Sequence, residues 1–472
     1  NTYVQSGGTL APGNSIGKLS AEGLVAFASG SNFDVELDSA GNNDRLLASG
    51  DVTIASGTTL NIGPETPGED GSTYEWVTYY LLISANAVNG TFDAVVDTYA
   101  LLDAIVTYDA TNVYLTMLRN DIDFTTVATT PNQIATGGAV TALGAGSPIY
   151  QAVLFAGPTN APLALDLLSG EVHATAQTLL AQNSQFALSA AHQHDLNPGT
   201  NVWGQLAGNW TDIDSDGNAS AASQSIYGAF AGADFNLSDR LNLGILTGVT
   251  SSDFTVATVN SSGSTTAFHV GGYGNTTIGA VALSFGGVYS IYDITTSRTV
   301  AIVDLNEVLS ANYGANSTSI FGEASYEIDL RGQALAPFVN VSYTHLRSDA
   351  FSETGGDAAL STTEAASLDL VFATLGVRAA REMTLAGRPA TLSGSIGWQH
   401  GFGDLTPGVD VAFAGQPSFA IAGLPSAADS VLLSLGVDME LGADFNLALA
   451  YDGQFAAGAQ NHAVQLTLSK AF

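Results

Sequence analysis

Three stretches of the sequence hold residue types that could do chemistry, and the first is "GNSIG" at residues 13–17. It matches G-x-S-x-G, the turn that presents a nucleophilic serine in α/β-hydrolases, which would make Ser15 the nucleophile. That motif needs a strand before the serine and a helix after it. Ser15 instead lies among Pro, Gly and Asn, and no helical pattern follows. We interpret the match as a coincidence within a turn.

The second stretch, "DIDSDGN", places Asp212, Asp214 and Asp216 before Gly217, like the first half of an EF-hand calcium loop. An EF-hand needs Glu at its twelfth position and helices on both sides. Here the twelfth position is Ser223, and the flanking residues alternate as strands do. The pattern predicts a surface loop whose three carboxylates have at most weak affinity for Ca²⁺.

The third group is His173, His192 and His194, which lie on one predicted helix. Residues two apart on a helix do not face each other, so His192 and His194 are a poor metal-binding pair. Cysteine is absent, which excludes disulfides, thiolate zinc sites and cysteine nucleophiles. The sequence therefore predicts a protein that is not an enzyme and has no metal site or cofactor.

The composition restricts the classes of partner. The net charge of −33, from 11 basic and 44 acidic residues, would repel nucleic acid. Apolar residues are dispersed, and no run approaches the ~18 to 20 residues that a membrane-spanning helix needs. Asn1 is not followed by a signal-peptide pattern, so we expect the chain to be a mature or trimmed form of an exported protein.

Residues 1 to about 120 alternate short apolar runs with Gly, Asn and Ser turns, as in "NFDVELD" and "GDVTIASGTTLNI". This spacing is typical of a stacked β-solenoid or a sandwich. Helical patterns follow over residues 131–194, and the longest runs from Gly170 to His194 with Ser169 as a candidate N-cap. Its surface is mostly small and polar, which suits a water-filled tube and not lipid.

From Asn201 to Phe472 apolar and polar residues alternate persistently, as in "VLLSLGVDMEL" (431–441), and about twelve strands can be distinguished. Short turns alternate with long connections, which we place near 213–220, 256–264, 296–312, 347–366 and 403–427. Apolar-out, polar-in strands with this asymmetry of loops are typical of an outer-membrane β-barrel. Aromatic residues near strand ends could form its interfacial girdle: Trp203, Trp210, Trp398, Tyr289, Tyr292, Tyr343 and Tyr451. Ordinary packing in a β-core is the alternative for each of them.

The chain ends on an alternating strand, "AVQLTLSKAF". Its pattern predicts Val464, Leu466 and Leu468 on the lipid side, Gln465, Thr467 and Ser469 toward the lumen, and the terminal Phe472 at the interface.

The motifs in this order resemble the monomeric autotransporters of Gram-negative bacteria over almost the whole chain. "GGTLAPGNSIGKL" and "NDRLLASGDVTIASGTTLNI" are similar to the closing coils of the family's passenger β-helix, and "VTYDATNVYLTMLRND" to its stem. "TPNQIATGGAVTAL" and "LLSGEVHATAQTLL" resemble the helical linker, and "VWGQLAGNW" and "GAFAGADFNL" the first barrel strands. The implied domains are a right-handed β-helix stem (1–125), a helical linker (126–160), a lumen helix (161–198) and a barrel of about twelve strands (199–472).

The resemblance implies a protein of the outer membrane whose residues 1 to about 160 lie on the cell surface. A monomeric barrel would translocate its own passenger, and the helix would then plug the pore. The implied plug residues are Ser169, Glu171, His173, Gln177, Gln182, Asn183 and Gln185. The implied partners are outer-membrane lipid and lipopolysaccharide, periplasmic chaperones, and the β-barrel assembly machinery, which would recognise the strand with Val464, Leu466, Leu468 and Phe472.

Some members of the family cut off the passenger at an Asn-Asn pair in the lumen helix. Here Asn183 is followed by Ser184, so self-cleavage of that type is not expected. Three alternatives stay open: a surface adhesin or biofilm protein with the barrel only as an anchor, a passenger-borne hydrolase, and a diffusion porin. A porin would have neither the solenoid nor a lumen helix.

Overall fold

The computed structural model describes residues 1–192, 200–238, 240–329, 334–442 and 444–472. Two compact units divide the chain. The first comprises Asn1–Ala128, Val140–Ala164 and Ile302–Leu305, and the second comprises Thr129–Ala139, Leu165–Ala301 and Asn306–Phe472. His194 and the rest of the segment 193–199 lie outside the described residues.

The first unit begins as a solenoid with three faces. Its three sheets have the orders β1-β4-β7-β10, β11-β8-β5-β2 and β12-β13-β9-β6-β3, and the rungs from coil to coil are parallel. Antiparallel pairing of β13 with β9 and β12 ends the stack. The strands are β1 (Thr2–Val4), β2 (Thr9–Leu10), β3 (Lys18–Ala21), β4 (Val25–Phe27), β5 (Asn32–Leu37), β6 (Arg45–Ala48), β7 (Val52–Ile54), β8 (Thr59–Pro64), β9 (Val77–Ser84), β10 (Val88–Asn89), β11 (Ala94–Asp97), β12 (Leu102–Tyr108) and β13 (Asn112–Arg119).

Apolar ladders form the solenoid core, because equivalent residues of successive coils stack directly upon one another. Val25 pairs with Val52, and Phe33 with Leu60. The ring of Phe33 also stacks on that of Phe92, with centroids 6.0 Å apart. The parallel sheets agree with the predicted β-helix stem, and its handedness stays a prediction.

A 3₁₀ turn, η1 (Phe124–Thr126), precedes the helices α1 (Pro131–Leu143), α2 (Pro148–Leu168) and α3 (Glu171–His192). Helix α2 is interrupted at Gly157, whose φ of 73° is left-handed, directly before Pro158. No helix among the described residues is both long and apolar enough to cross a membrane.

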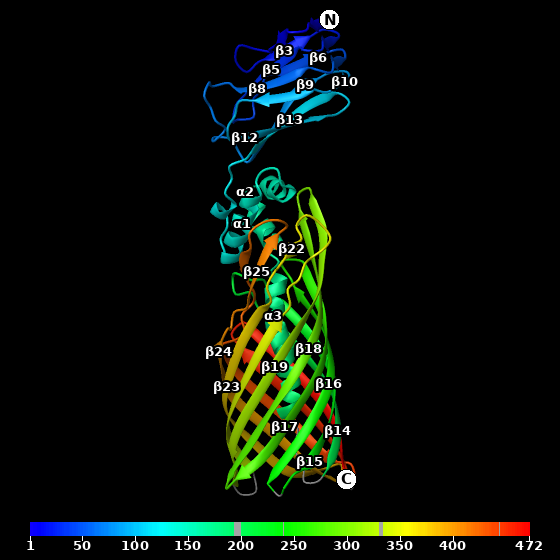
Figure 1. Cartoon of the computed structure of the whole chain (residues 1–472), viewed down its shortest axis with the longest axis vertical. Helices are drawn as coiled ribbons and strands as arrows, with labels where there is room; N and C mark the ends of the chain where they lie inside the picture. The colour runs from blue at the N-terminus through cyan, green and yellow to red at the C-terminus, as the bar shows by residue number, and fades with distance from the viewer. Residues whose placement is uncertain (193–199, 239, 330–333, 443) are drawn as a thin grey trace. The chain divides into compact units, whose positions relative to one another are not determined.

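The second unit is a closed antiparallel barrel around α3 (Figure 1). Its sheet has thirteen strands within the described residues, but the two-residue β20 (Ile328–Asp329) continues β19, so the barrel has twelve strand positions. They are β14 (Asn201–Ile213), β15 (Ala222–Asn236), β16 (Leu241–Val256), β17 (Ser261–Ile278), β18 (Val281–Ile302), β19 (Leu305–Tyr326), β21 (Ala334–Ser348), β23 (Ala366–Leu385), β24 (Arg388–Gly403), β27 (Asp429–Glu440), β28 (Phe445–Ala456) and β29 (Ala459–Ala471).

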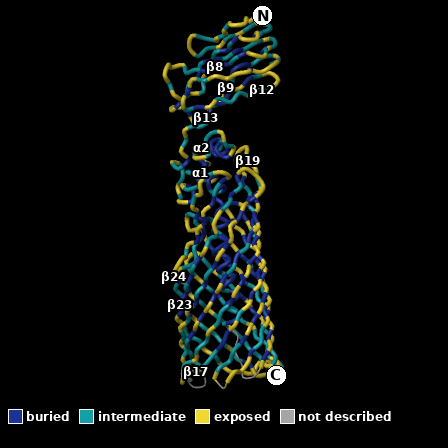
Figure 2. Tube along the Cα trace, viewed as in Figure 1, coloured by how far each residue is buried: buried dark blue, intermediate teal, exposed yellow. Residues whose placement is uncertain are grey.

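The first and last strands close the barrel. Strand β29 pairs with β14 in continuous register from Asn201↔Ala471 to Ile213↔Ala459. Buried and exposed residues alternate along the barrel strands, as Figure 2 shows. The prediction of an antiparallel barrel of about twelve strands with a lumen helix is therefore confirmed.

Two of the predicted long loops are wrong. Residues 256–264 hold only a short turn between β16 and β17, and residues 296–312 are mostly strand, because β18 and β19 meet at a turn of two residues. Cross-strand hydrogen bonding, and not hydrophobicity, extends these strands. The connections after β21 and β24 are long, and within them β22 (Leu360–Ser361), β25 (Gly408–Phe413) and β26 (Phe419–Ala422) form a small sheet.

Candidate functional site

The interior of the barrel is the candidate functional site, because α3 fills part of it. The helix packs against β15, β16, β17 and β21, and against the loop strands β25 and β26. Glu171 opens the helix, and the hydroxyl of Ser169 accepts a hydrogen bond from its backbone N–H at 3.3 Å. The helix can pack here because the inward face of the strands offers polar partners and also apolar side chains, such as Phe230, whose ring centroid lies 6.0 Å from that of Phe186.

Residues of the long loops form hydrogen bonds with the first half of α3, at the end of the barrel that we call its mouth. Thr178 donates to the carbonyl of Leu424 at 2.6 Å, and Thr175 accepts from the backbone N–H of Leu424 at 3.2 Å. The Gln177 amide donates to the carbonyl of Gly408 at 3.0 Å. The carboxylate of Glu171 accepts from the backbone N–H of Ser220 at 2.9 Å.

Close packing at this contact requires Gly423. A Cβ at Gly423 would lie 2.4 Å from the backbone carbon of Ala174, which is far inside van der Waals contact. The loop backbone therefore rests directly on the helix backbone.

A buried ion pair joins the helix, the wall and a loop in the same region. Arg298 of β18 meets Glu353 of the loop after β21 in a forked pair, with Nε to Oε1 and Nη2 to Oε2 both 2.7 Å long. The ring of His173 places Nε2 2.9 Å from the same Oε1, and its Nδ1 lies 3.3 Å from the hydroxyl of Tyr313. All four side chains are buried.

The carboxylate of Glu353 is saturated with donors, since the backbone N–H of Leu360 also reaches Oε2 at 2.8 Å. Burial alone would raise the pKa of Glu353, but the bonds from His173 and Arg298 outweigh it and hold that pKa at about 2. Arg298 also donates to the carbonyls of Leu167 and Ala358, at 3.0 and 2.6 Å. We call Arg298, Glu353, His173 and Tyr313 the mouth cluster.

Hydroxyl and amide groups hold the middle of the helix. Ser184 lies 2.7 Å from the hydroxyl of Tyr292 and donates to Ser317 at 2.9 Å. The side-chain oxygen of Asn183 accepts from Thr250 at 3.1 Å. The Gln185 amide donates to Thr344 at 2.8 Å.

A second ionic group stands at the other end of the helix. The carboxylate of Glu323 lies 2.8 Å from Nε2 of His192 and 3.1 Å from a guanidinium nitrogen of Arg378. His192 is therefore a partner of the barrel wall.

The helix does not fill the whole lumen. A cavity of about 1190 Å³ lies beside it, toward β23, β24, β27, β28 and β29. Gln182 and Gln185 line the cavity from the helix side, and the carboxylates of Asp438, Glu440 and Asp452 line it from the wall. The interior thus offers a polar space that is acidic on one side.

The predicted aromatic girdle needs two corrections. Trp203 is only 4% exposed and points into the lumen, where its indole N–H donates to Tyr273 at 2.7 Å. Tyr292 is also buried inside. Trp203 shares its parity along β14 with Gln205 and Asn209, which are inward-facing, so this signal was present in the sequence.

The other predicted aromatics lie on the outward face. Trp210, Tyr289 and Trp398 are exposed, and the indole N–H of Trp398 donates to Asp429 at 3.1 Å. Tyr343 donates to Asp369 at 2.6 Å, and the hydroxyl of Tyr451 lies 2.8 Å from Nδ1 of His462. Their role as membrane anchors stays a prediction.

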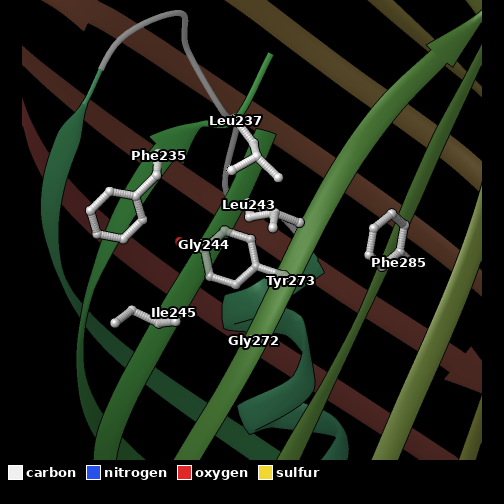
Figure 3. A pocket seen from close by; sticks show the side chains of 8 residues that line it. All are labelled: Phe235, Leu237, Leu243, Gly244, Ile245, Gly272, Tyr273 and Phe285. Carbon is white, nitrogen blue, oxygen red and sulfur yellow. The ribbon is translucent and has the colours of Figure 1, made fainter. Parts of the chain in front are cut away.

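The outward face of the wall also carries an apolar notch of about 510 Å³ near the turn between β15 and β16. Figure 3 shows its side chains around two glycines, Gly244 and Gly272. A Cβ at Gly244 would lie 2.3 Å from the ring of Tyr273, so this glycine makes room for the partner of Trp203.

Strand β29 places its side chains in two sets. Val464, Leu466 and Leu468 are exposed on the outward face, and Gln465 is buried on the inward face, where it accepts from the amide of Gln205 at 2.8 Å. The role of this strand in assembly stays a prediction.

As far as their residues are described, the stretches with chemical residue types assemble no reaction centre. Ser15 donates to Glu65, and the seven histidines of the chain begin at His173, so residues 1–172 contain no histidine to act as its base. The carboxylate of Asp216 accepts backbone N–H groups of its own loop. Among the described residues, no group of three or more His, Asp or Glu is arranged to hold a metal ion.

The sequence missed the mouth cluster. Asp166, the acidic residue shortly before α3, accepts from the amide of Gln133 at 2.9 and 3.0 Å. Arg298 lies on the inward face of β18, and this position marked it as a lumen residue. Its partner Glu353 lies in an irregular loop, where no periodicity reveals the direction of a side chain.

Comparison with known proteins gives three findings. The sequence model of the autotransporter beta-domain family matches residues 202–452. Two Serratia marcescens proteins named "Extracellular serine protease" are 27% identical over 528 residues (98% of this chain, 50% of the relative) and 26% identical over 550 residues (100% and 52%). The translocator domain of autotransporter NalP from Neisseria meningitidis has the same fold, with a TM-score of 0.52 and 13% identity over 64% of this chain and 98% of that chain.

The names of the two relatives contradict the prediction that the protein is not an enzyme. That prediction rested on catalytic groups sought within these 472 residues. The chain, however, spans about half the length of the curated relatives it matches.

Proposed function

The chain belongs to the autotransporter beta-domain family, and we propose that its barrel exports its own N-terminal passenger and afterwards keeps α3 in the lumen as a plug. The protein is an autotransporter of the Gram-negative outer membrane. We take the short-turn end of the barrel as periplasmic and the long-loop end as external, as in outer-membrane barrels generally. The proposed domains are residues 1–125 as stem, 126–160 as linker, 161–198 as lumen helix and 199–472 as translocator.

The mouth cluster is the observation that carries the plug. Glu353 can meet His173 only when the helix is in the lumen and the loop has folded over it. A passenger in transit would hold that loop away, so the buried ion pair belongs to the state after export. The proposed sequence is passage of the passenger, entry of α3 and closure of the loop.

Bilayer conductance tests the plug. Deleting residues 161–194 removes α3 and should raise the single-channel conductance severalfold, because the whole lumen becomes available to ions. The matched control lacks residues 1–125 and keeps the helix, so its conductance should equal that of the full chain. A full chain that is already as conductive as the deletion variant would refute the plug.

The individual binding partners are proposed from the general properties of outer-membrane barrels. A monomeric barrel of this kind needs outer-membrane lipid and lipopolysaccharide around its apolar face, chaperones during its passage through the periplasm, and the assembly machinery for insertion. These partners follow from the membrane location and from the apolar outward face of β29.

A serine protease activity is proposed for the passenger that this barrel carries, on the strength of the names of the two relatives. Ser15 is not the proposed nucleophile. A fluorophosphonate probe should therefore leave the 472-residue chain unlabelled, as it should the Ser15→Ala variant, and should label a longer natural form that contains the active passenger. Labelling of the 472-residue chain that Ser15→Ala abolishes would overturn this assignment.

A further inference from the structure

Three outward-facing residues form a stack at the rim where the barrel chain ends. The ammonium of Lys470 lies 4.6 Å from the ring centroid of Phe472 and 5.5 Å from that of Phe445. Phe445 opens β28 and pairs with Lys470 across the β28–β29 ladder. We call these three residues the rim clamp.

The rim clamp lies just beyond the apolar band. Val464, Leu466 and Leu468 precede Lys470 on the outward face of β29 at every second position, and all three are exposed. A lysine in this position keeps its methylene chain along the apolar surface and its ammonium at the headgroup level. Both rings are exposed too, with Phe472 at 73%.

The charge of Lys470 is unusual for its surroundings. The chain has a net charge of −33 and only 11 basic residues. Among the described residues at or near the short turns of the barrel, Arg240, Arg381 and Arg388 are basic and Glu382, Glu440 and Asp444 are acidic, and the carbonyl of Asp444 accepts from the backbone N–H of Ala471 at 2.8 Å. Within the described part of the chain, no carboxylate lies at ion-pair distance from Lys470.

We propose that the rim clamp is a binding site for the phosphate group of a phospholipid in the periplasmic leaflet. The assignment rests on the proposed function, because that function sets which end of the barrel faces the periplasm. The ammonium supplies the charge, and the two rings hold it in place by cation–π contact without neutralising it. Phe445 and Phe472 then lie against the glycerol and upper acyl region of the bound lipid, continuous with the apolar face of β29.

A phosphate is the occupant that this chemistry favours. A cation at the headgroup level that has no ion-pair partner among the described residues, flanked by two rings and followed by an apolar face, complements a lipid with an anionic head and acyl tails. A protein carboxylate would satisfy only the charge, and it would leave the two exposed rings and the adjoining leucines uncovered.

Lipid retention tests the proposal. The intact 472-residue barrel is released from defined vesicles in mild detergent, and the bound lipids are counted by native mass spectrometry. The vesicles contain phosphatidylglycerol, phosphatidylethanolamine or a phosphate-free galactolipid of the same chain length. The wild type should retain both phospholipids, with phosphatidylglycerol bound more tightly, and should not retain the galactolipid.

Four variants sharpen the test. Lys470→Met should lower phospholipid retention by roughly fivefold, which is the contribution expected of one cation at an anionic surface. Lys470→Arg should restore it. Phe445→Leu should lower it by less, because one ring remains. The matched control is Arg347→Met, which removes an exposed cation at the long-loop end of β21 and therefore at the other end of the barrel from the rim clamp. It should leave phospholipid retention unchanged.

Equal retention by Lys470→Met and the wild type would overturn the site, as would equal retention of the galactolipid. Binding of an acidic peptide in preference to phospholipid would assign the clamp to a protein partner and would also overturn it. Heat-modifiable gel migration shows whether each variant is folded as a barrel. It therefore separates loss of the lipid site from loss of the barrel on which the proposed function depends. A variant that is folded as a barrel but has lost lipid refutes nothing about export.

Discussion

Replacing Glu353 by Gln should release the lumen helix while the barrel stays intact. The carboxylate receives Nε and Nη2 of Arg298, Nε2 of His173 and the backbone N–H of Leu360. Each oxygen faces two donors, so an amide nitrogen in either position would confront donors and leave Arg298 buried without its counter-charge. Breaking a buried pair in this way costs about 3–5 kcal/mol. We expect about 3 kcal/mol, because two backbone carbonyls still bind Arg298.

A loss of about 3 kcal/mol raises the open fraction of the plug roughly a hundredfold. The chain has no cysteine, so a single cysteine at the buried Ala176 of α3 reports opening without background. The rate at which this cysteine reacts with a small thiol-reactive reagent should rise about a hundredfold in Glu353→Gln. The matched control is Glu307→Gln, since Glu307 binds the backbone of the same loop at Asp357 and Ala358 without reaching the helix.

The mouth cluster should also make the docking of α3 depend on pH. The folded state lowers the pKa of Glu353 from 4.5 to about 2, so its contribution is complete above pH 4.5 and is lost as the pH falls from 4.5 toward 2. The rate for the buried cysteine, divided by the rate of a free thiol at the same pH, should rise in that window, because the thiolate fraction itself falls with pH, and Glu353→Gln should remove this rise. An unchanged thiol rate in Glu353→Gln, or an equal rise in Glu307→Gln, would refute the reasoning.

Three further predictions concern other parts of the barrel. Gly423→Ala forces a Cβ to within 2.4 Å of the Ala174 backbone and should cost about 1–3 kcal/mol of helix docking, read by the same cysteine probe; an unaltered rate would contradict the close contact. Deleting Phe472 should slow insertion into the outer membrane far more than it lowers the unfolding midpoint of inserted barrels, and equal insertion kinetics would leave only an anchor. Brominated lipids should quench the fluorescence of a variant that retains only Trp398 and spare one that retains only Trp203, because the latter indole lies in the lumen; equal quenching would place both on the lipid face.

The barrel was predictable from the sequence because one physical requirement acts on every strand. A strand between lipid and a polar interior must alternate, and Val464, Leu466 and Leu468 against Gln465 show it within one decapeptide. Helix α3 was predictable for a related reason. A long segment without interior Pro that is too polar for lipid has a place inside the barrel, and the predicted span of 170–194 differs from the observed Glu171–His192 by one residue at its start.

The sequence determined the family, the helices and most of the strands with their alternating faces, because these follow from periodicity and from motifs along the chain, but it did not determine the ends of β16 to β19. Only the tertiary structure decided which groups meet. Arg298 and Glu353 are 55 residues apart, and His173 is 180 residues from Glu353, yet the three share one buried site. Their meeting depends on the position of α3 inside the barrel and on the path of an irregular loop over the helix. Neither leaves a periodic trace in the sequence, because loop conformation is set by long-range contacts and not by the order of its own residues.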